Sequence, residues 1–222
     1  MTANTLVWHG SAPDGLRGFT ASAGSAGIVV GRRHSGEVFP VRLLRPEPTR
    51  VALVGGAWLA WLVAFRCLGA GARVEVTTAT RSRWSALGGL AGAGDRLVIG
   101  GPNEDIRATN GETRPVLRID DVGLGAPGDA GAPWETQLSV VPAITETTAQ
   151  TLAEANVSLL QRLSDDEAMI CASTLHLPST VETRLSQRHD DLLVVVVSGI
   201  ARFVWYALTP TEEQLLGPPV RR

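Results

Sequence analysis

The stretch that decides the fold is residues 50–71, RVALVGGAWLAWLVAFRCLGAG. Arg50–Val54 is a compact apolar run that predicts a buried β-strand, and Gly55-Gly56 follows it directly. Ala57–Leu68 predicts a helix, which the Gly-Ala-Gly sequence after it terminates. Because this helix is apolar on almost every side, we expect the N-terminal residues or a partner protein to bury its second side.

Strand and helix continue to alternate after this unit. Ala72–Thr78 and Arg96–Ile99 predict strands on either side of a short helix at Arg81–Leu90. The elements predicted after them are strands at Pro115–Asp121, Thr136–Val141 and Asn156–Leu160, helices at Thr148–Glu154, Ser164–Leu175 and Pro178–Gln187, and a closing hairpin of Leu192–Val197 and Ala201–Leu208. Short glycine-rich connections favour a mainly parallel sheet with crossover helices. The expected fold is therefore α/β, a three-layer P-loop-like or Rossmann-like sandwich with helices on both faces of the sheet.

The first 48 residues have a different character. Short β-like pieces at Thr5–Trp8, Gly27–Gly31 and Glu37–Leu44 are separated by clusters of glycine, serine and proline. Arg45-Pro46-Glu47-Pro48 predicts a stiff connector, because each proline holds the residue before it extended. We therefore expect a small β-rich region at 1–48, an α/β domain at 49–215 and a tail at 216–222.

Composition restricts the chemistry that the chain can perform. Of its 222 residues, 44% are hydrophobic and 19% are charged, which is typical of a globular protein with a substantial core. All 20 basic residues are arginine, so no side chain can act as a phosphate-binding lysine or form a Schiff base. The net charge is −2 and the charges are dispersed, so no nucleic-acid partner is expected. The N-terminus lacks a basic segment followed by an apolar one, which predicts a cytoplasmic protein without a signal peptide.

The turn at Gly55 and Gly56 is a candidate nucleotide-binding position, since a glycine-rich joint exposes amide groups at a helix N-terminus. Two established patterns do not fit it. A dinucleotide fingerprint needs G-x-G-x-x-G and an acidic residue after the second strand, but Trp58 stands where a phosphate would approach and no acid ends that strand. A P-loop needs lysine and a hydroxyl residue after its glycines, and neither is present. The glycines are therefore expected to allow tight strand–helix packing, and nucleotide binding remains the alternative.

Two aspartates, Asp120 and Asp121, end the strand VLRI and resemble the magnesium-holding end of a Walker B strand. Without a phosphate loop, such a pair more often forms a turn or caps a helix. Cys67 and Cys171 have no metal-binding spacing and are expected to be buried thiols. We therefore predict no metal, no cofactor and no catalytic residue, and assign Gly55, Gly56 and the two aspartates to a cofactor only if the nucleotide alternative holds.

Two clusters are candidate protein-binding residues. Trp58 and Trp61 flank the turn at the carboxyl end of the first parallel strand, where large aromatic side chains either fill a pocket or bind a partner. Arg32 and Arg33 lie in the densest basic region and could contact an acidic partner or anionic lipid headgroups. The expected partners are a protein, a second copy of the chain and, through the arginines, the membrane surface.

From residue 51 to residue 213 the order of features resembles the motor domain of the conjugation and DNA-translocase class of P-loop ATPases, which includes the type VII secretion ATPases. The matching pieces are RVALVGG, PVLRIDD, ETQLSVV, NVSLLQRLSDDEA and the late Thr209-Pro210-Thr211-Glu212. The chain is also similar to actinobacterial proteins associated with type VII secretion. It departs from the motor class where the phosphate lysine and magnesium hydroxyl would stand, within Gly55–Leu62.

The resemblance and this departure together lead to one expectation about function. A motor-like fold without its phosphate-binding residues is expected to serve through its surface. The chain is therefore expected to be a non-catalytic protein-binding or assembly module, an accessory or regulatory component of a type VII secretion apparatus. The alternative is a nucleotide-binding or dinucleotide-binding protein, or an enzyme, that uses the turn at Gly55 and Gly56 in a way unlike a P-loop.

Overall fold

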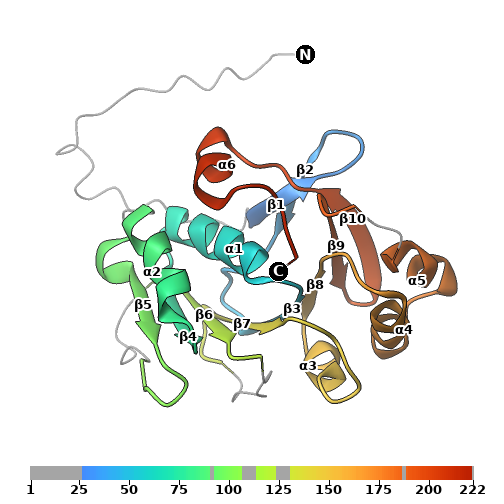
Figure 1. The fold of residues 1–222 in the computed structure, drawn as a ribbon, viewed down its shortest axis with the longest axis horizontal. Coiled ribbons are helices and arrows are strands. Elements are labelled where there is room, and N and C mark those ends of the chain that lie inside the picture. The colour runs from blue at the N-terminus through green and yellow to red at the C-terminus, as the bar shows by residue number, and fades with distance from the viewer. Residues whose placement is uncertain (1–26, 91–92, 107–113, 124–130, 187–188, 222) are drawn as a thin grey trace.

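A computed structural model describes residues 27–90, 93–106, 114–123, 131–186 and 189–221 (Figure 1). These residues form a ten-stranded sheet. Its strands are β1 (Ile28–Arg32), β2 (Val38–Val41), β3 (Thr49–Val54), β4 (Arg73–Thr78), β5 (Leu97–Gly100), β6 (Val116–Asp121), β7 (Glu135–Val141), β8 (Val157–Leu160), β9 (Leu192–Val197) and β10 (Ile200–Trp205). The α-helices are α1 (Ala57–Gly69), α2 (Arg81–Leu90), α3 (Ala149–Ala153), α4 (Asp165–Thr174), α5 (Ser179–Ser186) and α6 (Pro210–Leu216). The predicted strand at Thr5–Trp8 lies outside the described residues.

The strand order across the sheet is β2-β1-β10-β9-β8-β3-β7-β6-β4-β5. Strands β8, β3, β7, β6, β4 and β5 are parallel, and β9, β10, β1 and β2 extend the sheet by antiparallel pairing. The predicted α/β class with a mainly parallel sheet is confirmed. Residues 28–41 belong to the same sheet, so the boundary expected after residue 48 falls within one continuous structure.

Side chains of the central strand β3 point alternately into two separate hydrophobic cores, one on each face of the sheet. Val51 and Leu53 of β3 face the core with α1 and α2, whereas Ala52 and Val54 face the core with α3, α4 and α5. A parallel strand covered on both faces is apolar along its whole length, which is why β3 is a continuous hydrophobic run. Figure 1 shows α1, α2 and α6 on one side of the sheet and α3, α4 and α5 on the other.

Helices do not cover the whole second face of the sheet. Over β4, β6 and β7 that face is polar, and its centre is Glu75, which is only 1% exposed. Glu75 pairs with Arg73 at 2.9 Å and with Arg118 at 2.5 Å, and Arg118 also lies 2.9 Å from Glu135. A cavity of about 490 Å³ lies over these strands. The predicted helices on both faces are confirmed, and on this face α3, α4 and α5 pack around Ala52 and Val54 of β3.

The outer side of α1 is covered from within the chain. Arg66 of α1 forms a bidentate ion pair with Glu212 of α6 at 2.6 and 2.7 Å. The same guanidinium donates to the backbone oxygens of Ala207, at 2.7 Å, and of Val29 in β1. The second cover of α1 is therefore α6 together with β1, and no partner protein is needed to bury this helix. Within the described ranges, no helix has the length and apolar character that crossing a membrane requires.

Candidate functional site at the carboxyl end of the parallel strands

The turn between β3 and α1 consists of Gly55 and Gly56, and the side chain of Gln161 fills it. Gln161 directly follows β8, and its amide N–H donates to the Val54 oxygen at 3.0 Å. Its Oε1 accepts the Gly56 N–H at 2.7 Å, at the N-terminus of α1. A Cβ at Gly55 would lie 2.2 Å from this oxygen, and Gly55 has a φ of +153°, so only glycine fits there. The amide that could have faced a phosphate is therefore satisfied internally.

Trp58, in the first turn of α1, is 4% exposed. Its ring meets Tyr206 edge to face, with 5.0 Å between the centroids. The indole Nε1 donates to the backbone oxygens of Leu216 and Gly217 at 3.1 and 3.3 Å. Burial raises the pKa of Tyr206, whose hydroxyl lies near Gln161. Trp58 therefore binds a segment of its own chain, and contact with a partner through this residue would require that segment to move.

Gly217, the second acceptor of the Trp58 indole, begins the segment Gly217–Arg221, which we call the strap. Gly217 adopts a φ of +67° where α6 ends, a conformation that glycine tolerates best, and this turns the chain back toward the sheet. In Figure 1 the segment after α6 returns to the middle of the molecule beside the start of α1. It reaches Pro142, which follows β7, and Arg162, which follows β8. The strap thus crosses the carboxyl end of the parallel strands, where open α/β sheets usually bind their ligands.

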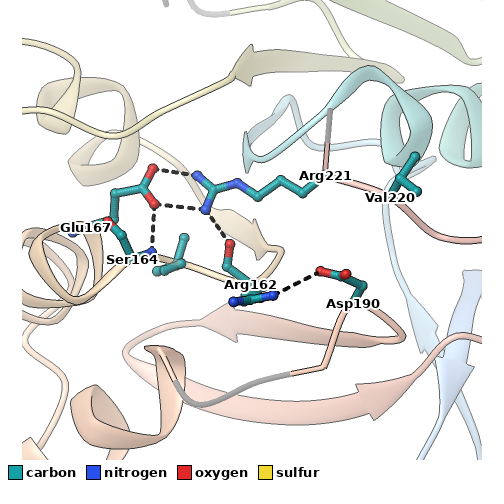
Figure 2. A pocket seen from close by; sticks show the side chains of 7 residues that line it. Arg162, Ser164, Glu167, Asp190, Val220 and Arg221 are labelled. Atoms are coloured by element: carbon teal, nitrogen blue, oxygen red, sulfur yellow. Dashed lines mark hydrogen bonds and ion pairs between the residues drawn. The ribbon is translucent and has the colours of Figure 1, made fainter.

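Arg221 fixes the far end of the strap (Figure 2). Its guanidinium forms a bidentate pair with Glu167, with one distance of 2.8 Å, and donates to the backbone oxygens of Arg162 and Pro142. Glu167 is also the third residue of the α4 capping box, in which it accepts the Ser164 N–H at 2.8 Å. Burial opposes ionisation of Glu167, but Arg221 and the Ser164 amide outweigh that effect and lower the pKa of the carboxyl. The carboxylate is therefore charged and fully coordinated.

The two aspartates at the end of β6 serve the local structure. Asp121 Oδ2 accepts from Thr78 Oγ1 at 3.0 Å and from Trp84 Nε1 at 2.7 Å, whereas Asp120 Oδ1 accepts the Val122 N–H at 3.1 Å. Strand β7 lies between β6 and β3, which places these residues about 10 Å from the Gly55 turn at two strand spacings. Among the described residues, no group of three or more histidine, cysteine, aspartate or glutamate side chains is arranged to hold a metal.

The other candidate binding residues lie apart from the strap. Trp61 packs edge to face on Trp84, with 6.2 Å between the centroids, and is half-buried. Arg32 and Arg33 belong to the β1–β2 hairpin, and their hydrogen bonds, to the Gly36 oxygen and to Glu37, remain within it. The structure therefore does not gather the arginines and tryptophans into one site.

Residues that the sequence analysis did not single out form most of the site. Gln161 directly follows a predicted strand, and Glu167 lies in the first turn of a predicted helix, so local patterns placed both residues without revealing their distant contacts. Helix α6 was not predicted, although Thr209 and Glu212 form a complete capping box around a proline at the helix start. No local pattern marks Arg221.

The sheet order and the strand–turn–helix unit define an α/β fold with a mainly parallel sheet. Three solved structures are similar to it. VirB4 of Thermoanaerobacter pseudethanolicus is 8% identical, with 85% of this chain and 98% of that chain covered and a TM-score of 0.62. The genome packaging NTPase B204 from Sulfolobus turreted icosahedral virus 2, in complex with AMPPCP, is 8% identical, with coverages of 72% and 98% and a TM-score of 0.56. The pCW3 conjugation coupling protein TcpA, in its monomer form with ATPγS, is 11% identical, with coverages of 82% and 66% and a TM-score of 0.53.

At these identities the similarity establishes the fold and nothing further. No protein-family model matches the sequence, and no curated protein sequence matches it either. The α/β fold expected from RVALVGG and PVLRIDD is therefore supported by structure comparison. The relation to type VII secretion rests on the sequence resemblance alone.

Proposed function

We propose that this chain is a non-catalytic protein-binding and assembly module of a bacterial secretion or conjugation apparatus, with a type VII apparatus as the narrower assignment. The carrying observation is the occupied carboxyl end of the sheet, where Gln161 takes the amide at the start of α1 and the strap crosses the strand ends. The general role is supported by the fold, which is shared with VirB4 and with a conjugation coupling protein. The type VII assignment is supported by the sequence resemblance.

Three features argue against ATP turnover. The β3–α1 turn has two residues, too few for a loop that wraps around phosphates. The chain contains no lysine that could contact the β- and γ-phosphates. Asp121, the best candidate for a magnesium ligand, accepts two hydrogen bonds from Thr78 and Trp84. Each part of the phosphoryl-transfer machinery is absent from its expected position or engaged in packing.

The second candidate function is nucleotide binding without hydrolysis. The observation in its favour is that two structures of similar fold were solved with AMPPCP and with ATPγS. In this chain, a nucleotide phosphate at the start of α1 would have to displace Gln161 from the Gly56 amide. It would also need the strap to leave the strand ends. Both costs oppose binding, so the first function is preferred.

A thermal-shift titration separates the two functions. A nucleotide with a Kd of about 10 μM, present at about 1 mM, would stabilise the fold by roughly 2.7 kcal/mol and raise Tm by roughly 5–10 °C. We expect magnesium with ATPγS, AMPPCP or NAD to leave Tm unchanged. A reproducible rise with any of them would contradict the proposal.

Protein binding requires its own test. The chain should be co-expressed with the secretion or conjugation motor encoded in the same gene neighbourhood, and the complex analysed by size-exclusion chromatography with light scattering. We expect a complex of defined stoichiometry that survives gel filtration. If both proteins elute separately at micromolar concentration, the assembly role with that motor is excluded.

A further inference from the structure

We propose that the strap occupies a peptide-binding site, and that this site also accepts a partner protein's segment carrying Pro-Pro, one further residue and then arginine. The inference rests on the proposed protein-binding function and specifies the partner's chemistry. Within this chain the motif is Pro218-Pro219-Val220-Arg221; hydrogen bonds hold Gly217, directly before it, and Arg221, at its end. The bound strap shows which chemical groups the site recognises.

The first recognition element is the Trp58 indole. It donates to the backbone oxygens of Leu216 and Gly217, immediately before the proline pair. Trp58 is buried, and its edge-to-face contact with Tyr206 fixes the orientation of the ring. The indole N–H is therefore already oriented toward the position of the backbone acceptors when a peptide binds. Proline-rich segments lose little conformational entropy on binding, because they are extended already, and aromatic surfaces commonly recognise them.

The second recognition element is Glu167, with two backbone oxygens beside it. The two carboxylate oxygens of Glu167 accept from the two terminal nitrogens of the Arg221 guanidinium, and the Arg162 oxygen accepts from one of these nitrogens (Figure 2). The Pro142 oxygen accepts from the other one at 3.2 Å. This planar, bidentate arrangement suits a guanidinium far better than an ammonium. The site therefore selects arginine at this position of the peptide.

Exposure alternates along the strap, which lies on the surface of the domain. Pro219 and Arg221 are partly buried, whereas Pro218 is exposed and Val220 is 38% exposed. At about 3.1 Å per residue, the four steps from Gly217 to Arg221 reach at most roughly 12 Å, which limits the spacing between the two recognition elements. A cavity of about 400 Å³, lined by Arg162, Asp190 and the strap itself, remains beside it. The strap therefore fills only part of the site, and a longer peptide has room for flanking residues.

The experiment is a fluorescence-anisotropy titration of full-length chain into the labelled peptide QLLGPPVR, residues 214–221. In the unaltered chain the strap competes at an effective concentration on the order of millimolar. In Arg221→Glu the new carboxylate faces Glu167 and releases the strap, so the peptide should bind at least ~10-fold more tightly than to the unaltered chain. Arg221→Ala provides a second opened chain if Arg221→Glu fails to melt cooperatively.

Matched variants test each recognition element in the opened chain. Glu167→Gln retains a side chain that can complete the capping box but loses the charge, and it should weaken peptide binding at least ~10-fold. Asp166→Asn, on the exposed side of the same helical turn, should leave binding unchanged. A peptide with glutamate in place of its arginine, or with one glycine inserted before the arginine, should not bind.

The outcomes are distinct. The proposed peptide site is wrong if neither opened chain binds the peptide at about 1 mM, a concentration at which even a very weak interaction would be detected. It is also wrong if the arginine and glutamate peptides bind equally. That result would leave the proposed module free to bind its partner through another surface. Conversely, stabilisation by ATPγS would contradict the proposed function while peptide binding could still be measured.

Discussion

The ion pair between Arg66 and Glu212 should be the strongest single connection between α1 and α6. The side chains are 12% and 4% exposed, and two N–O contacts of 2.6 and 2.7 Å join them. Arg66→Met would preserve much of the aliphatic packing while leaving the carboxylate without its cation. It would also remove the donors to the backbone oxygens of Ala207 and Val29.

The expected loss follows from this geometry. Removing one partner of a buried, hydrogen-bonded pair costs about 3–5 kcal/mol, so the free energy of unfolding should fall by about 4 kcal/mol. For a chain of this length the corresponding drop in Tm is roughly 8–16 °C. Glu212→Gln should cost less, about 2 kcal/mol, because glutamine can still complete the α6 capping box and accept a hydrogen bond from Arg66.

Urea unfolding at pH 7, followed by circular dichroism, measures both changes. The matched control is Arg33→Met, which removes the Arg33–Glu37 pair on the exposed β1–β2 hairpin, where the side chains are 46% and 64% exposed. Exposed pairs contribute less than about 1 kcal/mol. If Arg66→Met costs no more than Arg33→Met, burial does not give this pair its strength and the inferred role of α6 is wrong.

Three further predictions concern single sites. Gly55→Ala should cost at least about 2 kcal/mol in urea unfolding, because its Cβ would meet Gln161, whereas Gly69→Ala meets no atom within 4 Å and should cost little. Burial alone would raise the pKa of Glu167, but Arg221 lowers it. The ionised carboxylate therefore stabilises the fold fully above about pH 4.3, and its contribution is lost as the pH falls through the lower pKa of the folded state. Between pH 6 and pH 3, the free energy of unfolding should consequently fall less in Glu167→Gln than in the unaltered chain. Burial raises the pKa of Cys67 to about 12, so Ellman's reagent should label this thiol only after unfolding, and rapid native labelling would show that the α1 core opens.

The central architecture could be predicted from the sequence because parallel strands leave a local signature. Strands buried on both faces are continuous apolar runs, and Val51–Val54 of β3 is such a run. Glycine-rich joints then indicate crossover connections. The place of β1 and β2 in the sheet could not be predicted, because pairing with β10 joins residues more than 170 positions apart. Hydrophobic periodicity carries no information about such partners.

The glycine turn lies at the candidate site, but the residues that fill and surround it could not be predicted. Gln161 and Gly56 are separated by 105 residues, and Arg221 and Glu167 by 54. Capping boxes mark Glu167 and Glu212 as helix-starting residues, yet nothing local shows that each also binds an arginine from another element. For such a residue, the neighbouring sequence indicates the capping role but not the ion pair with a distant arginine.

The carboxyl end of this sheet presents two donors that burial makes costly to leave unpaired, the Gly56 amide and the Trp58 indole N–H. A nucleotide-binding protein can leave such donors to its ligand. Here each donor has an acceptor from the same chain, Gln161 Oε1 for the first and the oxygens of Leu216 and Gly217 for the second. The two acceptors differ in how they are held. Gln161 follows a central strand and is fixed by the sheet. Leu216 belongs to α6, whereas Gly217 begins the strap, which depends on Arg221 at its far end. Exchange with a partner is therefore expected at the Gly217 oxygen and not at the Gly56 amide.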